Sequence, residues 1–311
     1  MIGGGVVGAA VALALVRRGA DTVLLEAKEI AAGASGANSG LLHVAFDSPP
    51  GELETELILR SAQLRDPVID ALGIPVRRCG ALVRDGRGGT FEVADEAVTD
   101  PAAYTRALAA AAAACGAEIR TGFRLTDRRE VPARVTVNCA GLYADDVARL
   151  FGDDSFEIFP RKGEFAVFDG LELDHVLFPA PDPRTRGVLV FPTVDGKVIA
   201  GPTAVDQDDK EDWSVRPEAV DEIRRSAAEL LPALADAEPI ATYAGLRPAG
   251  RGCNYVIRRH GDLVNVAAIR STGLSACHGI AERVAEMLLP GAAERPLPRV
   301  ATPPGPPWWQ R

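Results

Sequence analysis

The sequence has few aromatic residues and no excess of positive charge. Of its 311 residues only 5% are Phe, Trp or Tyr, and the acidic residues outnumber the basic ones by 43 to 34, a formal net charge of −9 at pH 7. Single-stranded nucleic acid is usually bound on aromatic side chains, and duplexes or anionic membranes are bound by clustered cations. We therefore expect no nucleic acid among the partners.

Long apolar runs and paired cysteines are also missing. The longest apolar stretches, 6–16 and 107–115, fall short of the ~20 residues that a membrane-spanning helix needs. The five cysteines are scattered without a C-x-x-C pair, and the four histidines lack metal-ligand spacing. These absences predict reduced thiols, no metal site, no transmembrane segment and a cytoplasmic location, with peripheral attachment to a membrane left open.

A glycine motif of the form G-x-G-x-x-G stands at the N-terminus, made by Gly3, Gly5 and Gly8. An alanine-rich segment of helical period follows over 6–18, and residues 21–26 form a predicted buried strand that ends in an acid. In this context the glycines allow a tight turn and close approach to a pyrophosphate, while the helix N-terminus supplies N–H donors and partial positive charge. The pattern predicts a dinucleotide-binding βαβ unit, and the alternative is a glycine-rich turn before an ordinary helix.

The acid at the end of that strand, Glu26, indicates which dinucleotide is bound. It lies 18 residues after Gly8, close to the spacing of about 20 in the dinucleotide fingerprint. A carboxylate there accepts hydrogen bonds from ribose hydroxyls and would repel the 2′-phosphate of NADP, which favours FAD or NAD. Only Met1 and Ile2 precede the glycines, so the first strand of the unit is almost entirely missing; an upstream start or a lost core strand would explain this.

A second loop of small residues favours FAD over NAD. Residues 31–43 read AAGASGANSGLLH, and an NAD dehydrogenase has no need of such a loop, whereas a flavin ring needs close backbone approach and many amide donors. This stretch resembles the D-amino-acid-oxidase-like superfamily of FAD-dependent oxidoreductases. Within that superfamily it is most similar to the branch of glycerol-3-phosphate dehydrogenases and L-2-hydroxyglutarate dehydrogenases.

Further blocks follow in the order that the superfamily shows. They are the strand and turn at 135–145, the Pro-x-x-Gly turn at 159–165, the hairpin at 191–203, the Gly-Leu-Arg-Pro segment at 244–248 and the closing strand, loop and helix at 261–289. The resemblance covers most of residues 2–289. It implies that FAD is bound by Gly3, Gly5, Gly8, Glu26, Ser35, Asn38, Ser39, Gly40, Ala140, Gly141, Gly273, Leu274 and Ser275.

The fold implied is α/β: a discontinuous Rossmann-like FAD-binding domain with a smaller α+β substrate domain built on an antiparallel sheet. We assign the FAD-binding domain to 1–75, 99–152 and 244–290, and the substrate domain to 76–98 and 153–243. The Pro-rich tail, 291–311, is predicted to be disordered.

Three residues are candidates for the chemistry. In the resemblance Arg247 would clamp an anionic group in bidentate fashion, although by composition alone it would be an ordinary surface arginine. His43 would act as general base, with a packed histidine or a covalent flavin link as alternatives. Arg270 would stabilise anionic flavin or bind substrate, or lie on the surface. Cys277 and His278 are interpreted as structural, and Arg161, Lys162 and Asp145 as solvated.

The predicted function is oxidation of a CH–OH group in a small anionic substrate, glycerol 3-phosphate or an L-2-hydroxy acid such as 2-hydroxyglutarate, by hydride transfer to flavin N5. The alternatives are an amine or amino-acid oxidase or demethylase of the same superfamily, and a non-catalytic FAD-binding remnant or complex subunit. The electron acceptor (O2, a quinone or a redox protein) is left open.

Overall fold

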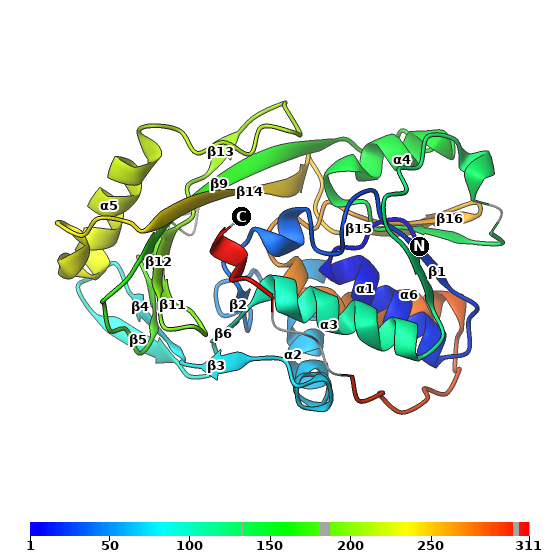
Figure 1. Ribbon diagram of the computed structural model, residues 1–311, viewed down its shortest axis with the longest axis horizontal. Helices are drawn as coiled ribbons and strands as arrows, with labels where there is room; N and C mark the ends of the chain where they lie inside the picture. The colour runs from blue at the N-terminus through cyan, green and yellow to red at the C-terminus, as the bar shows by residue number, and fades with distance from the viewer. Residues whose placement is uncertain (132, 181–186, 301–304, 311) are drawn as a thin grey trace.

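The computed structural model describes residues 1–131, 133–180, 187–300 and 305–310. Figure 1 shows two parts side by side: a large sheet with α5 (Ala219–Leu230) beside it, and an N-terminal part in which helices pack together near a smaller sheet. This is the mixed α/β architecture predicted from the sequence. Within the described ranges, no helix is both long enough and apolar enough to cross a membrane.

The smaller sheet is held together by the first two residues of the chain. Ile2 forms parallel bridges to Leu25 on one side and to Asn138 on the other. Met1 and Ile2 therefore occupy the central position, where the sequence indicated a missing strand. They join strands β7 and β1 on one side to strands β8, β16 and β15 on the other. The strands are β1 (Val23–Leu25), β7 (Glu118–Arg120), β8 (Thr136–Asn138), β15 (Val256–His260) and β16 (Leu263–Ala267).

Alternate residues of this sheet face two different helical layers. Leu24 and Val264 belong to the apolar cluster shared with α1, α3 and α6, whereas Leu25 and Leu263 belong to the cluster shared with α4. This two-residue period is expected for a sheet covered on both faces. The helices are α1 (Val6–Arg17), α2 (Leu53–Leu72), α3 (Pro101–Ala114), α4 (Ala144–Leu150) and α6 (Gly273–Leu288).

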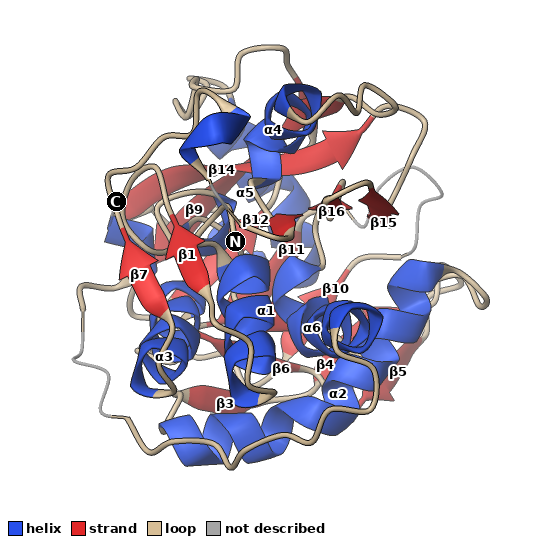
Figure 2. Ribbon diagram, turned by 90° about the vertical axis from the view of Figure 1, so that its right-hand side faces the viewer, coloured by secondary structure: helices blue, strands red, loops and turns tan. Residues whose placement is uncertain are grey.

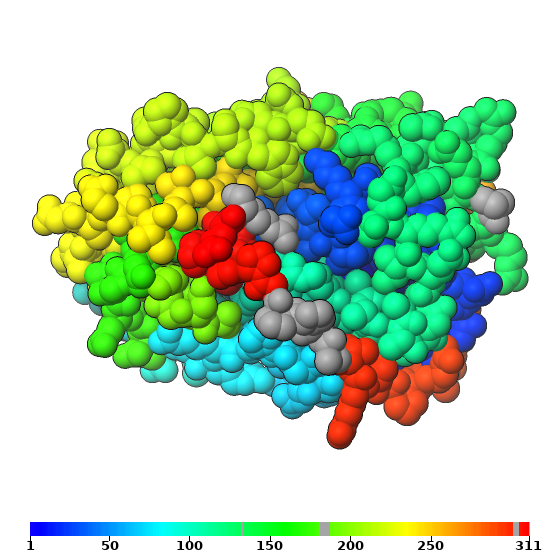
Figure 3. Space-filling model, viewed as in Figure 1, coloured from blue at the N-terminus to red at the C-terminus, as the bar shows by residue number. Residues whose placement is uncertain are grey.

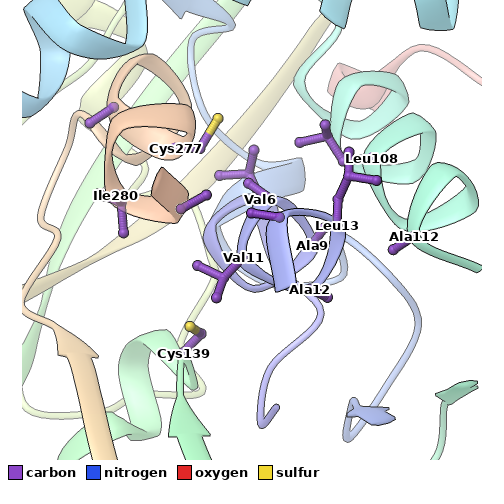
Figure 4. Packing of buried hydrophobic residues seen from close by; sticks show 14 of the residues in the cluster. Val6, Ala9, Val11, Ala12, Leu13, Leu108, Ala112, Cys139, Cys277 and Ile280 are labelled. Carbon is purple, nitrogen blue, oxygen red and sulfur yellow. The ribbon is translucent and has the colours of Figure 1, made fainter. Parts of the chain in front are cut away.

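Helix α1 lies between α3 and α6 (Figure 2), and α2 packs against α6. The side chains that α1 presents to its neighbours include Ala9 and Ala12, both without solvent exposure. Figure 4 shows Leu108 of α3 and Ile280 of α6 on opposite sides of α1. Small side chains let three helices approach closely above the sheet. Helix α1 and the closing helix α6 were predicted from the sequence, but α2 was not.

The large sheet has the strand order β13-β9-β12-β11-β10-β4-β5. Strand β14 lies outside this sequence of neighbours and pairs with β9. Strands β9 and β14 pair antiparallel over their whole length, from Ala241 opposite Val167 to Gly250 opposite Ile158, and Figure 1 shows both reaching out of the large sheet toward α4. The predicted domain boundary at 243/244 therefore falls inside β14. The strands are β4 (Ala81–Arg84), β5 (Thr90–Val93), β9 (Ile158–Phe168), β10 (Val176–Phe178), β11 (Leu189–Pro192), β12 (Val198–Gly201), β13 (Val205–Asp206) and β14 (Ala241–Gly250).

A third, small antiparallel sheet has the order β2-β6-β3, made by β2 (Leu41–Leu42), β6 (Ala97–Thr99) and β3 (Val76–Arg78). Of the segment assigned to the substrate domain, 76–98, only β4 and β5 join the large sheet. Strand β6 instead pairs with β3 on one edge and with β2 on the other, and β2 is formed by Leu41 and Leu42 at the end of the second small-residue loop. This pairing places Glu96, immediately before β6, next to His43, immediately after β2.

The C-terminal segment is ordered where the structure describes it, which corrects the prediction of a disordered tail. Trp308 and Trp309 are 1% and 6% exposed, and both belong to an apolar cluster that includes strands of the large sheet. The indole of Trp308 donates to the carbonyl of Asn38, and that of Trp309 to Asp195. Figure 3 shows this segment (red) between the large sheet and the N-terminal part. Two large indoles overcome the disorder that the surrounding prolines favour; residues 301–304 and 311 of the predicted tail lie outside the described residues.

The imidazole of His278 of α6 is buried against Tyr104. Its Nε2 lies 2.7 Å from the hydroxyl of Tyr104, which has no solvent exposure. Burial, reinforced by the nearby positive charge of Arg65, lowers the pKa of His278 to about 4. The imidazole is therefore neutral in the folded protein at neutral pH, and it is a structural group as the sequence indicated.

This burial predicts acid destabilisation with a defined origin. Between pH 6.5 and about 4 the unfolded chain binds a proton at His278 that the folded chain does not, so the free energy of unfolding falls as the pH is lowered through this window. At about 1.4 kcal/mol per pKa unit the loss amounts to about 3 kcal/mol. Urea unfolding at several pH values should show a flatter pH dependence for His278→Gln, whereas His260→Gln at an exposed site should leave the dependence unchanged. Identical slopes for wild type and His278→Gln would contradict the buried neutral histidine.

Candidate functional site

A cavity of about 1070 Å³ runs between the two parts of the molecule. It is lined by the glycine turn before α1, the second small-residue loop, the N-terminus of α6 and residues of β9 and β14. Its volume lies at the upper end of the range for small-molecule sites, ~300–1000 Å³, as a dinucleotide with a substrate beside it would require.

The glycine turn forms one end of the cavity. A Cβ on Gly8 would come within 2.0 Å of the carbonyl oxygen of Gly3, and Gly3 itself has a φ of +103°. These positions must be glycine for the turn to close. Glu26 lies beside the turn, where its carboxylate accepts hydrogen bonds from the main-chain N–H groups of Gly4 at 2.6 Å and Lys28 at 2.8 Å.

The second small-residue loop is held by its own polar side chains. The hydroxyl of Ser35 accepts a hydrogen bond from the main-chain N–H of Val6 at 2.9 Å, which ties the loop to the first turn of α1. The side-chain amide of Asn38 donates to the carbonyl of Ser35 at 2.9 Å and accepts from the N–H of Gly40 at 2.8 Å. The loop thus keeps its shape without help from a ligand.

Residues distant in sequence support the same loop from outside. The carbonyl of Asn38 accepts hydrogen bonds from the hydroxyl of Tyr243 and the indole of Trp308, each at 3.0 Å. Gly245 of β14 faces the carbonyl of Ala37, which a Cβ on Gly245 would approach to 1.9 Å. The large sheet and the C-terminal segment therefore press directly on the loop.

The N-terminus of α6 opens onto the cavity through Gly273 and Leu274. No side chain caps this helix, so its first N–H groups are available to a negatively charged group. Beside it, the buried carboxylate of Glu54 accepts a hydrogen bond from Thr272 at 2.7 Å and lies 3.4 Å from the guanidinium of Arg270. Arg270 is thus a half-exposed cation at the rim, balanced in part by Glu54.

His43 lies at the end of β2 and lines the cavity, although it is only 6% exposed. Its main-chain N–H donates to the hydroxyl of Ser275 at 2.9 Å, and its ring Nδ1 lies 3.1 Å from a carboxylate oxygen of Glu96. With Nδ1 directed at Glu96, Nε2 is the ring nitrogen left for a molecule in the cavity.

Arg247 is fixed in β14 by main-chain carbonyls. Its Nε donates to the carbonyl of Arg161, and its Nη2 donates to those of Lys162 and Thr203 at 3.1 and 2.7 Å. Nε and Nη2 are therefore already hydrogen-bonded, so Nη1 is the guanidinium nitrogen left for the predicted bidentate contact with an anion. Among the described residues no hydrogen-bond partner of Nη1 is found.

The charge of Arg247 is not neutralised by a paired carboxylate among the described residues. Desolvation and the positive charges of Arg161 and Arg270 together lower its pKa to about 10, while Asp206 opposes this shift. Asp206 is already engaged in an ion pair with Arg161. Because Arg247 remains protonated at neutral pH, this part of the cavity is positively charged and suited to an anion.

Two residues interpreted as solvated are buried instead. Lys162 lies within β9, where its side chain is 3% exposed and pairs with Asp212 at 2.7 Å. Asp145 is 2% exposed and accepts a hydrogen bond from Lys210 at 2.8 Å. The sequence showed only polar residues at both positions, and the ion pairs that make their burial tolerable come from the loop between β13 and α5.

That loop, residues 207–215, closes the cavity near the glycine turn and was not recognised in the sequence. Lys210 binds Asp145, and Glu211 contacts Tyr143 and Lys28, while Lys210, Glu211 and Trp213 line the cavity. It begins on the large sheet and binds the helical part, so it spans the two parts of the molecule. Neither a motif nor a periodicity marks it.

The structure gathers most of the residues predicted for the site around one cavity. Those that line it are Gly3, Gly5, Glu26, Ser35, Asn38, Ser39, His43, Ala140, Gly141, Arg247, Arg270, Gly273 and Leu274. Three others lie behind this surface and support it. Gly8 makes room for the turn, Gly40 has a φ of +73°, and Ser275 bonds to His43. Glu96, Glu54 and Trp308 were missed, because one acid among 43 or a tryptophan in a Pro-rich tail carries no signal of its own.

The residues present fit FAD. The glycine turn leaves no side chain where a pyrophosphate would approach, and the N-termini of α1 and α6 open onto the same cavity. A carboxylate stands at the end of β1 for ribose hydroxyls. Cys139 also lines the cavity, but burial raises the pKa of its thiol to about 12, so the thiol is neutral and unreactive.

Comparison with known proteins identifies the same cofactor. The family model described as FAD dependent oxidoreductase (DAO) matches residues 1–86 and 82–287. The chain is 27% identical to the glycerol 3-phosphate dehydrogenase of Caloramator mitchellensis over 349 residues, which cover 93% of this chain and 73% of that protein. It is 25% identical to the glycerol 3-phosphate oxidase of Mycoplasma pneumoniae over 358 residues, which cover 93% of both.

A solved structure of dithionite-reduced L-α-glycerophosphate oxidase from Mycoplasma pneumoniae with FAD bound has the same fold. The TM-score is 0.86 at 24% identity, and the match covers 96% of each chain. The predicted fold, a Rossmann-like FAD-binding domain with a smaller antiparallel-sheet domain, is confirmed.

The site predicts a selective loss of cofactor on removal of Glu26. In Glu26→Ala the ribose hydroxyls lose a charged acceptor, and hydrogen bonds to charged groups contribute about 1.5–3 kcal/mol, so the dissociation constant for FAD should rise about 10- to 150-fold. Titration of the apoprotein with FAD, followed by flavin fluorescence, measures this. Glu29→Ala, an exposed acid three residues away, serves as the control. Equal affinities in the two variants would remove Glu26 from the cofactor site.

Proposed function

The chain belongs to the family of FAD dependent oxidoreductases, and from this premise we propose that it oxidises the secondary alcohol of a small anionic substrate, with glycerol 3-phosphate as the first candidate. FAD is its cofactor. The observation that carries the substrate class is the half-buried, protonated Arg247, which lines the same cavity as His43 and whose charge is not neutralised by an ion pair among the described residues.

Different residues of the cavity bind the substrate and accept its proton. Nη1 of Arg247 holds the anionic group of the substrate, and the positive charge of Arg161 and Arg270 adds to the attraction. FAD, when bound, accepts a hydride at N5. Nε2 of His43 takes the proton of the substrate hydroxyl. The C–H bond breaks and its electron pair leaves with the hydride, the O–H proton moves to His43, and a C=O bond forms, so the alcohol loses two electrons and two hydrogens.

An L-2-hydroxy acid such as 2-hydroxyglutarate satisfies the same arrangement, since a carboxylate replaces the phosphate opposite Arg247. An amine substrate is less well matched, because the two curated relatives described above are named for the oxidation of glycerol 3-phosphate. Turnover would also require an electron acceptor, for which O2, a quinone and a redox protein remain the candidates.

Anaerobic reduction of the bound flavin tests this proposal directly. Glycerol 3-phosphate should bleach the absorbance of the oxidised flavin in a single-turnover mixture, and glycerol, which lacks the anion, should not do so at the same concentration. Bleaching by 2-hydroxyglutarate alone would keep the reaction and change the substrate. Bleaching by an amino acid with release of ammonia would replace the proposal by amine oxidation.

Replacement of Arg247 should affect substrate far more than cofactor. Arg247→Ala removes a charged hydrogen bond to the anion, so KM should rise about 10- to 150-fold while the FAD content stays unchanged. Arg251→Ala, an exposed arginine paired with Glu157, is the control. A parallel loss of FAD and substrate binding in Arg247→Ala would refute the anion-binding role.

A further inference from the structure

We propose that Glu96 is a positioning residue for the reaction: it fixes the proton of His43 on Nδ1 and so keeps Nε2 free to accept the proton of the substrate. The inference rests on the proposed function of His43 as the base. It concerns a residue that neither a motif nor a spacing identifies.

Both carboxylate oxygens of Glu96 have a defined partner. Glu96 has no solvent exposure and immediately precedes β6. Its Oε1 accepts the main-chain N–H of Val44 at 2.9 Å, and its Oε2 lies 3.1 Å from Nδ1 of His43. One oxygen is thus tied to the backbone beside His43 and the other to the ring itself, which sets the position and the rotation of the imidazole.

The groups around this pair leave the carboxylate facing the ring. From α2, the buried guanidinium of Arg65 donates to the carbonyls of Leu42 and His43 at 3.4 and 3.3 Å, and so turns toward the main chain. From β10, the ring of Phe178 lies 6.1 Å from that of His43 and is apolar. Burial raises the pKa of the nearby Cys79 thiol, and the negative charge of Glu96 contributes, so that thiol is neutral.

The chemistry of the pair follows from what a carboxylate can do. An ionised carboxylate only accepts hydrogen bonds, so Nδ1 of His43 must carry the hydrogen between them. Neutral imidazole has one N–H, which leaves the lone pair on Nε2. When Nε2 takes up the substrate proton, the imidazolium that forms is already paired with the negative charge of Glu96 in a site shielded from water.

Replacement by glutamine should reverse this arrangement rather than merely weaken it. The main-chain N–H of Val44 still requires an acceptor, so the single carbonyl oxygen of the glutamine is held there. The side-chain NH2 group then faces Nδ1 and donates to it, and the ring proton moves to Nε2. Glu96→Gln therefore preserves shape and hydrogen bonding while it blocks the atom that would act as base.

The experiment combines ring-nitrogen spectroscopy with flavin reduction. In protein labelled with 15N-histidine, the signals of His43 are assigned by their loss in His43→Gln. We expect the Nδ1–H tautomer in the wild type and the Nε2–H tautomer in Glu96→Gln, with and without substrate. Anaerobic reduction of the flavin should slow about 10²- to 10⁴-fold in Glu96→Gln, the range of a lost general base. Half-saturation by substrate should change less than threefold, because the anion-binding residues are untouched.

Asp153→Asn is the matched control, since Asp153, like Glu96, is buried and hydrogen-bonded, but its partner is Asn265 and not the cavity-lining His43. It should lower the melting temperature without changing the His43 tautomer. An Nε2–H tautomer in the wild-type protein overturns the proposal, and that measurement stands even where Glu96→Gln fails to fold. An unchanged tautomer and rate in Glu96→Gln also overturn it and leave His43 as the base. Wild-type rates in His43→Gln would instead remove the proposed base itself.

Discussion

The antiparallel pairing of β9 with β14 is the interaction on which the site depends. Ten residues of β14 lie opposite ten of β9, so the two strands form one stiff ribbon that leaves the large sheet and reaches the cofactor-binding part. Gly245 is set against the carbonyl of Ala37, and Arg247, two residues later on the same side of the strand, is held by carbonyls of β9. A shift of one residue in this register would turn Arg247 away from the cavity and bring the Cβ of a neighbouring residue of β14 against the second small-residue loop.

The conformation of the second small-residue loop, the cofactor loop, is therefore held by contacts on several sides. Ser35 and Asn38 shape it from within, Tyr243 and Trp308 bind its carbonyl from outside, and Gly245 packs on it without a side chain. The loop consists of residues with little apolar surface, which gain little from burial by themselves. Its rigidity comes from hydrogen bonds to larger elements, and this is how a segment of alanine, glycine and serine keeps a fixed surface for a flavin.

Local patterns sufficed for the features that are local in origin. The glycine turn, α1 and Glu26 lie within 26 residues, and their spacing alone indicated a dinucleotide site. The order of several blocks carried the resemblance and, with it, the fold. The features that were not predicted depend on contacts between distant residues. Glu96 lies beside His43 only because β2 pairs with β6, and the burial of Lys162 is tolerated because Asp212 forms an ion pair with it. The tail was misread because its proline content outweighed two tryptophans whose hydrogen-bond partners lie 270 and 114 residues earlier.

The bond between Trp308 and Asn38 also sets an order of events during synthesis. The ribosome adds the indole that binds the Asn38 carbonyl 270 residues after Asn38 itself. Tyr243 of β14, which binds the same carbonyl, follows Asn38 by 205 residues. Until both residues have been added, the nascent chain carries a cofactor loop that lacks its outer supports.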